Sequence, residues 1–255
     1  MNRVAWVVIL LLALAGIGWY ALHEQPARHM RKDEALLAAA GAHDHAVVED
    51  LLQRGANADA KDAFGRTALM LAAGSGDIGS MNVLLQHGAN PNARDIDGRT
   101  PLIWAAMNHQ PSAIAVLLSK NANVDAGDLD GTTALMYACS NGEMDAILPL
   151  IEHGAAVNSA RKDGQTALMV AALHGNVRAV EALIAHGARV NDRNSAGETA
   201  LILAARKGSV ATVRALLQHG ADPTLKDNKG NTALDAAARR GNIAVADLLR
   251  RYHQP

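Results

Sequence analysis

From about residue 33 onward, the apolar residues of this chain fall into short helical patterns separated by polar turns. Residues 68–75, rich in alanine and leucine, directly follow Thr67, and threonine is a favoured N-cap because its side chain accepts a hydrogen bond from a free backbone N–H of the first turn. Residues 177–184 instead place valine and leucine at the spacing of one helix face. Asp, Asn and Gly fill the stretches between such pairs, as in residues 90–98. The pattern predicts pairs of short helices joined by polar hairpin fingers.

This pattern returns every 33 residues. A glycine opens each copy of the first helical phrase, and further glycines, which adopt the left-handed conformation easily, end the helices. The opening glycines are Gly65, Gly98, Gly131, Gly164, Gly197 and Gly230. A fixed period of this length indicates a solenoid, in which each unit packs on its neighbours.

The period divides the chain into successive units. The first lacks the Gly-x-Thr opening, and the last ends with Arg250 and Arg251 where other units have apolar residues and glycine, so both are expected to cap the array. The predicted units are an N-terminal capping unit at 33–62, full units at 63–95, 96–128, 129–161, 162–194 and 195–227, and a C-terminal capping unit at 228–255.

The phrase G-x-T-[AP]-L-x-x-A-A-x-x-G, followed by L-L-x-x-G-A and a finger ending in D-x-x-G, resembles the ankyrin repeat over residues 33–255. The resemblance implies an all-α repeat solenoid, a stack of about seven helix pairs with projecting hairpin fingers, preceded here by one hydrophobic N-terminal helix. It also implies a non-catalytic module that binds a protein partner in a concave groove. The histidine of the family's T-P-L-H is replaced by residues such as Met70 and Asp235, so its side-chain hydrogen bonds are expected to be absent.

The N-terminal segment 1–22 is predicted to be a signal-anchor or a signal peptide. Its residues 4–22 carry no charge, which is close to the length that crosses a bilayer as a helix. Trp19 and Tyr20 lie where interfacial aromatic residues are found, which favours a single-pass anchor. The alternative is cleavage at the A-x-A match of residues 13–15, although this would leave an unusually short peptide.

The repeats are expected to lie outside the cytoplasm, in the periplasm if the source is bacterial. A short basic head with Arg3 before an apolar run is typical of an export signal. The positive-inside rule gives no clean orientation, because Arg28, Arg31 and Lys32 flank the other end within the predicted linker 23–32. The chain is thus expected at the cell membrane through residues 4–22, or as a soluble exported protein after cleavage.

Composition and motifs exclude several function classes. The chain has 24 basic and 25 acidic residues and a net charge of -1, so no global field favours nucleic acid. The single cysteine, Cys139, occupies a slot where other units carry alanine and is expected to be a buried small residue. No nucleophile elbow, phosphate-cradling loop or spaced acid–base pair is found, so neither catalysis nor a cofactor is predicted.

Histidines suggest a metal set at first sight. Stacked helices lie about 8–10 Å apart, too far for equivalent side chains to share a zinc ion readily, so these histidines are expected to complement helix C-terminal dipoles. One per unit precedes a helix-ending glycine: His87, His153, His186 and His219. The cluster at 43–45, His-Asp-His, lacks further ligands and is expected to be a polar turn, and an unrecognised catalytic or metal site there is the alternative.

Partner-binding residues are expected where the unit varies, because the repeated framework specifies the fold. The N-terminal side offers apolar finger tips with neighbouring arginines and a methionine on a first helix: Phe64, Ile96, Leu129, Arg66, Arg99 and Met107. The C-terminal side offers a basic stripe on fingers and first helices: Arg193, Arg206, Lys207, Lys226, Lys229, Arg239 and Arg240. An ordinary solvated face and a surface for anionic lipid head groups are the alternatives for this stripe.

Trp104 and Tyr137 fill the slot that Leu71 and Val170 occupy in other units. Two interpretations remain, core filling between neighbouring units and a partly exposed anchor for a partner, with core filling favoured. The same region is irregular, with His109 in place of a glycine. Asn121 also replaces glycine, Pro111 begins the second helix and Pro149 falls inside the next one, which indicates a tolerated kink or a locally shaped binding face.

The leading hypothesis is therefore a monomeric array, held at a membrane or exported, that binds a protein partner with an apolar anchor and an acidic segment. A regulatory or protective subunit of a separate enzyme is the alternative from another class.

Overall fold

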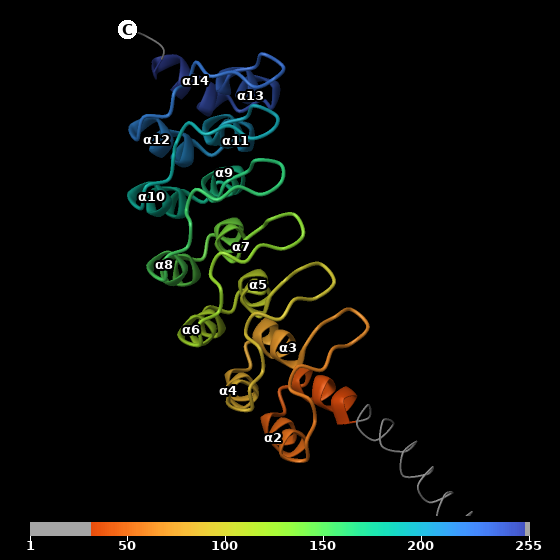
Figure 1. Ribbon diagram of the computed structural model, residues 1–255. Helices are drawn as coiled ribbons and strands as arrows, with labels where there is room; N and C mark the ends of the chain where they lie inside the picture. Colours follow the sequence, from red (N-terminus) through yellow and green to blue (C-terminus); the bar gives the residue numbers. More distant parts are fainter. Residues whose placement is uncertain (1–31, 253–255) are drawn as a thin grey trace, which may run out of the picture.

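The structure, a computed structural model, describes residues 32–252. Within them, helix pairs stack into one gently curved array, and the fingers project from its inner side (Figure 1). The first helix is described over residues 32–41, and it brings the number of pairs to seven. The all-helical solenoid and its projecting fingers are confirmed. The predicted apolar helix at 1–22 lies outside the described residues.

The two helices of each pair form two rows. The first helices lie beside the fingers, and after residues 32–41 they are α3 (Ala68–Ser75), α5 (Pro101–Met107), α7 (Ala134–Asn141), α9 (Ala167–His174), α11 (Ala200–Lys207) and α13 (Ala233–Arg239) (Figure 1). The second helices form the outer row: α2 (His45–Gln53), α4 (Ile78–Gln86), α6 (Pro111–Ser119), α8 (Met144–Glu152), α10 (Val177–Ala185), α12 (Val210–Gln218) and α14 (Ile243–Tyr252). Among the helices of residues 32–252, none has the length and apolar character needed to span a membrane.

Threonine begins the first helices, as predicted. The Thr67 hydroxyl accepts a hydrogen bond from the backbone N–H of Met70 at 3.3 Å, which satisfies a donor that the helix itself leaves free. The same bond recurs at Thr100, Thr133, Thr166, Thr199 and Thr232. These helices are only seven or eight residues long, so their ends decide whether they form.

The expected loss of the family histidine's hydrogen bonds is wrong at one end of the array. The Asp235 carboxylate accepts from both the backbone N–H of Thr232 at 2.9 Å and its hydroxyl at 2.8 Å, and these bonds lower the pKa of Asp235. In α3, the Met70 thioether takes the same place and accepts from the Thr67 N–H at 3.4 Å. A different side chain therefore closes the first turn in each case.

One hydrophobic core runs through the whole described array, from Leu36 to Leu249. Alanines facing neighbouring units let the helices approach closely, and leucines such as Leu69 and Leu168 fill the space between the rows. Each fully buried leucine contributes about 1.5–3 kcal/mol to folding. Cys139 is completely buried in this core, and burial raises the pKa of its thiol far above the ordinary range, so it remains a protonated, apolar side chain.

The irregular units keep the regular architecture. His109 and Asn121 adopt left-handed backbone conformations, with φ of 61° and 58°, as the glycines that they replace would do. Helix α8 continues through Pro149, and the Pro149 carbonyl accepts the backbone N–H of His153 at 3.0 Å. The proline is thus accommodated inside one helix without ending it.

Side chains at the turns between paired helices bind successive units together. Gly142 ends α7 with a φ of 77°. The side-chain amide of Asn176, which belongs to the next unit, packs beside Gly142. It donates to the backbone carbonyls of Cys139 and Ser140, at 2.8 and 2.9 Å. A Cβ added at Gly142 would lie 2.8 Å from the Cγ of Asn176, whereas one at Gly241 would meet nothing within 4 Å.

We therefore expect Gly142→Ala to lower the free energy of unfolding more than Gly241→Ala. Both substitutions force a left-handed alanine, which costs about 1–2 kcal/mol, but Gly142→Ala also displaces Asn176 and its two hydrogen bonds, worth about 1 kcal/mol each. Urea denaturation followed by circular dichroism measures both. Equal losses in the two variants would contradict this account of the turn.

Candidate partner-binding surface

Five of the six fingers are closed by one polar side chain at the base, and Arg161 takes this position in the remaining finger. In the first of them, one carboxylate oxygen of Asp62 accepts the backbone N–H groups of Phe64 and Arg66, both at 2.9 Å. Burial raises the pKa of Asp62, but these bonds and the Arg66 guanidinium outweigh that effect and lower it overall. The equivalent bonds are made by Asp95, Asp128, Asn194 and Asp227.

Neighbouring fingers are also joined through their backbones. The N–H of Ile96 donates to the carbonyl of Phe64 at 3.1 Å, and the N–H of Leu129 donates to the carbonyl of Asp97 at 2.9 Å. The same type of bond links each later pair of fingers, ending with Asn228 N–H to the Ala196 carbonyl. The fingers therefore form a fixed row instead of moving independently.

Three apolar side chains stand at the tips of the first fingers. Phe64 is 57% exposed, and Ile96 and Leu129 are each 60% exposed, although burying them would be favourable. The guanidinium of Arg66 lies 5.1 Å from the centre of the Phe64 ring and holds the ring on one side. The predicted finger tips are thus on the surface, where a partner can reach them.

Trp104 and Tyr137 are half-buried, and their polar atoms bind the finger bases. The Trp104 indole N–H donates to the second carboxylate oxygen of Asp95, and the Tyr137 hydroxyl donates to that of Asp128, each at 2.9 Å. The two aromatic residues therefore combine the alternatives posed by the sequence. Each packs between units, and each also presents part of its ring to the finger side.

A pocket of about 200 Å³ lies between the first two full fingers, and we call it the apolar slot. Phe64 and Ile96 form its rim and Trp104 one wall. Its charged lining residues are paired, since Arg66 bonds Asp62 at 2.6 Å and Arg99 bonds Asp97 at 2.8 Å. Those residues are Arg66, Asp95, Asp97 and Arg99. The slot suits an uncharged side chain.

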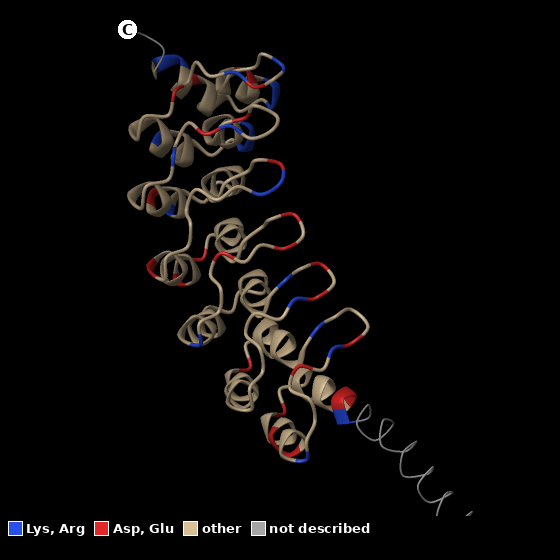
Figure 2. Cartoon of the chain, in the orientation of Figure 1, with Lys and Arg blue, Asp and Glu red and all other residues tan. Residues whose placement is uncertain are grey.

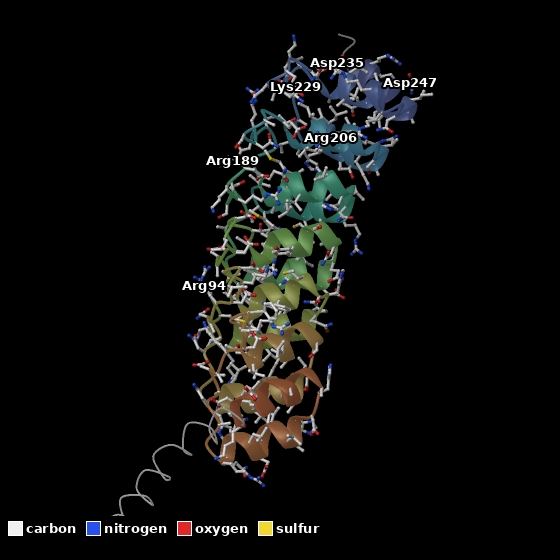
Figure 3. The ribbon with its side chains drawn as sticks, turned by 90° about the vertical axis from the view of Figure 1, so that its right-hand side faces the viewer. Arg94, Arg189, Arg206, Lys229, Asp235 and Asp247 are labelled. Carbon is white, nitrogen blue, oxygen red and sulfur yellow. The ribbon has the colours of Figure 1, made fainter. Side chains whose placement is uncertain are left out.

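A second pocket, of about 260 Å³, lies between the last two fingers, and we call it the basic slot. Four cationic side chains line it, Arg206, Lys229, Arg239 and Arg240, together with the two carboxylates of Glu198 and Asp227. Figure 3 shows Arg206 and Lys229 near the C-terminal end of the array. Arg206 is paired with Glu198, so its charge is partly balanced.

The first helices change abruptly in charge along the array. Helices α3, α5, α7 and α9 contain no Lys, Arg, Asp or Glu, whereas α11 ends in Arg206 and Lys207 and α13 is followed by Arg240. Figure 2 shows the same change, with α3, α5, α7 and α9 uncharged and basic residues beyond, whereas the first helix at residues 32–41 carries charged residues at its start. The predicted division into an apolar and a basic side is therefore a property of the folded surface.

One predicted contact residue, Arg193, links neighbouring fingers. Arg193 donates to the carbonyls of Gly197 and Lys226, at 3.1 and 2.7 Å, so its guanidinium links two fingers. Lys61 and Arg94 make the corresponding bond in earlier fingers. These bonds give Arg193 a structural role within the array itself.

The other predicted residues differ in accessibility. Lys207 and Lys226 are exposed, and Met107 is half-buried against the core. The acidic finger bases Asp95 and Asp128 were missed as residues of this surface, although the recurring D-x-x-G phrase marked their positions. Their contacts with Trp104 and Tyr137 join residues nine positions apart, and the finger fold brings them together.

Two of the four repeated histidines bond to the C-terminal ends of their helices. The rings of His153 and His186 bond the carbonyls of Pro149 and Ala182 at 2.8 Å, each at the C-terminus of its helix, as the sequence predicted. Between His43 and His45, Asp44 caps α2 by accepting the N–H of Val47 at 3.1 Å. No group of three potential metal ligands occurs within residues 32–252.

The geometry agrees with a known family. The family profile described as "Ankyrin repeats (3 copies)" matches residues 35–128, 121–194 and 191–254. The chain belongs to the ankyrin-repeat family. The crystal structure of the human ASB11 ankyrin repeat domain superposes with a TM-score of 0.78 at 24% identity, covering 86% of this chain and 98% of that one, which shows the shared fold. A comparison with curated proteins gave no match.

We expect Tyr137→Phe to lower the free energy of unfolding by about 1 kcal/mol near neutral pH, because Asp128 loses a hydrogen bond while the ring keeps its packing. Burial, with the Asp128 carboxylate, raises the pKa of Tyr137 above its ordinary value. This contribution is complete below about pH 10 and is lost as the pH rises toward the folded pKa.

Urea denaturation across alkaline pH, with tyrosinate absorbance, measures both effects. The wild type should lose stability above about pH 10 more steeply than Tyr137→Phe. Parallel profiles would show that the Tyr137–Asp128 bond does not stabilise the fold.

Proposed function

We propose that this ankyrin-repeat protein is a non-catalytic module that binds a protein partner on the finger side of the array. Ankyrin repeats are generally protein–protein interaction modules, and the family matches nearly all of residues 35–254. The observation that carries the proposal is the exposure of Phe64, Ile96 and Leu129 on a row of fingers that is fixed by hydrogen bonds. Rigid apolar groups lose little entropy when a partner covers them.

The partner is proposed to carry an acidic segment. The exposed cationic residues of the last unit, Lys229, Arg239 and Arg240, lie on the same side as the apolar tips. Opposite charges on a partner would steer its approach and fix its orientation. The uncharged first helices α7 and α9 lie between the two regions. A partner would therefore have to match both ends of the surface.

The array is further proposed to act beside a membrane or after export, with the repeats outside the cytoplasm. The support is the uncharged run at 4–22 in the sequence. A tether of this kind would hold the finger surface near membrane-associated or exported partners.

We expect the triple substitution Phe64→Ser, Ile96→Ser, Leu129→Ser to abolish partner capture while leaving the fold intact, because all three side chains are exposed. The measurement is a pull-down from extracts of the native cells, compared with wild type by mass spectrometry. Thermal unfolding checks the fold.

The chain offers a matched control on its outer row. Val47→Ser, Leu148→Ser, Ile243→Ser also removes three exposed apolar side chains, which are 42%, 37% and 73% exposed, but from the second helices. This control should capture the same proteins as wild type. The finger-side assignment fails if the control loses the partner and the finger variant keeps it.

The mature N-terminus separates the two forms of membrane association. We expect the protein from its native source to retain residues 1–22, as an anchor would. Intact mass measurement checks this. A mass lacking the first residues would show signal cleavage and overturn the anchored form.

A further inference from the structure

The apolar slot and the basic slot are the same place in the repeat, four units apart. Arg66 corresponds to Glu198, Asp95 to Asp227 and Trp104 to Ala236, each 132 residues further along the chain. Because the units stack regularly, these equivalent residues build two pockets with the same relation to the fingers and first helices.

Several substitutions distinguish the basic slot from the apolar slot, among them Lys229 in place of Asp97 and Arg240 in place of Asn108. The Trp104 ring that walls the apolar slot is replaced by the methyl group of Ala236, which leaves room in the basic slot. The equivalents of Gly74 and Met107 in the first helices are Arg206 and Arg239. Removing the ring and adding two guanidinium groups changes the chemistry of the pocket from apolar to cationic.

The carboxylates in the basic slot do not neutralise it. Asp227 already accepts the N–H groups of Lys229 and Asn231 and the Asn231 amide, and Glu198 is paired with Arg206. Four cations against two carboxylates leave a net charge of +2 among the lining residues. Within residues 32–252, Lys229 and the two arginines of α13 and its C-cap form no ion pair with a carboxylate shorter than 4.0 Å.

The units between the slots carry other residues at the position of Trp104. The positions equivalent to Trp104 are taken by Tyr137, whose hydroxyl is bound to Asp128, and then by Val170 and Leu203, which are 6% and 0% exposed. Arg161 and Asp163 of the intervening finger neutralise each other through two bonds of 2.8 Å. Recognition is therefore concentrated at two points.

We propose that the two slots bind a single extended segment of the partner, with one apolar side chain in the apolar slot and carboxylates in the basic slot. The inference rests on the proposed function and specifies its ligand. Four helix-to-helix steps of about 8–10 Å separate the slots by about 32–40 Å. An extended chain rises about 3.3 Å per residue, so the apolar residue and the acidic group lie about 10–12 residues apart.

Charge complementarity favours an acidic peptide as the occupant. The apolar slot, at about 200 Å³, accommodates one side chain, and its charged neighbours are already paired. A bare polyanion would satisfy only the basic slot and would meet the exposed Asp130 on a finger between the slots. A segment with both chemistries satisfies the two ends at once.

Synthetic peptides test the spacing. Each fluorescein-labelled peptide carries one leucine, a stiff proline spacer that rises about 3.1 Å per residue, and three glutamates, with spacers of about 4, 8, 11 and 16 residues chosen around the extended-chain estimate. Fluorescence anisotropy with the full-length protein should show the tightest binding at about 11. There the affinity should exceed that of peptides carrying only the leucine or only the glutamates by at least about tenfold.

Variants with matched charge identify the slots. Arg239→Glu, Arg240→Glu should weaken the best peptide at least about fivefold and remove its spacing optimum. The matched double reversal Arg178→Glu, Arg214→Glu, at exposed positions of α10 and α12 in the outer row, should not. Phe64→Ser, which alters the apolar slot, should likewise weaken the best peptide and remove the dependence of affinity on spacer length.

Binding without a spacing optimum, or no binding by any peptide, overturns the paired-slot inference. The capture experiment with Phe64, Ile96 and Leu129 judges the finger-side function separately. A partner captured by the wild type and lost by the finger variant would leave that function standing even if the peptides fail. Binding of glutamate-only peptides as tight as the best peptide would likewise overturn the pairing.

Discussion

The finger-base carboxylate is the interaction on which the functional surface depends. Its first oxygen closes the finger by accepting two backbone N–H groups, as in Asp95, and its second oxygen is free to bind a side chain that the unit varies. A different side chain binds this second oxygen in each of four fingers: Arg66, Trp104, Tyr137 or Asn231. Each choice satisfies a carboxylate that would be costly to leave unpaired, and each sets the local character of the surface.

Stability and recognition are thus separated within every unit. The buried threonine caps, the alanine and leucine core and the left-handed glycines recur because each helix pair must pack on the next with the same geometry. The residues that differ between units lie outside this geometry, on the tips and the exposed ends of the first helices. A change such as Met107 to Arg239 alters the surface without disturbing the stack.

The sequence predicted the scaffold in detail, because the caps and the apolar spacing act over a few residues and the period repeats them. It also placed Phe64, Ile96 and Leu129 on exposed tips. It did not reveal that the Arg193 guanidinium bridges two fingers, since a basic residue in a loop looks the same in the sequence whether it meets solvent or a carbonyl from the next unit. The hydrogen bonds of Asp235 were also missed, although they are local: Thr232 and Asp235 are three residues apart and form a capping box.

The sequence by itself determined the fold class, the helix ends and the change from uncharged to basic first helices, because these follow from local preferences repeated at a fixed period. The tertiary structure alone decided which side chains meet. Trp104 reaches Asp95 and Arg206 reaches Glu198 only once the finger folds back on its helix. The two equivalent slots exist because stacking brings residues of successive units together in one pocket. The distances between those residues cannot be read from the residue pattern.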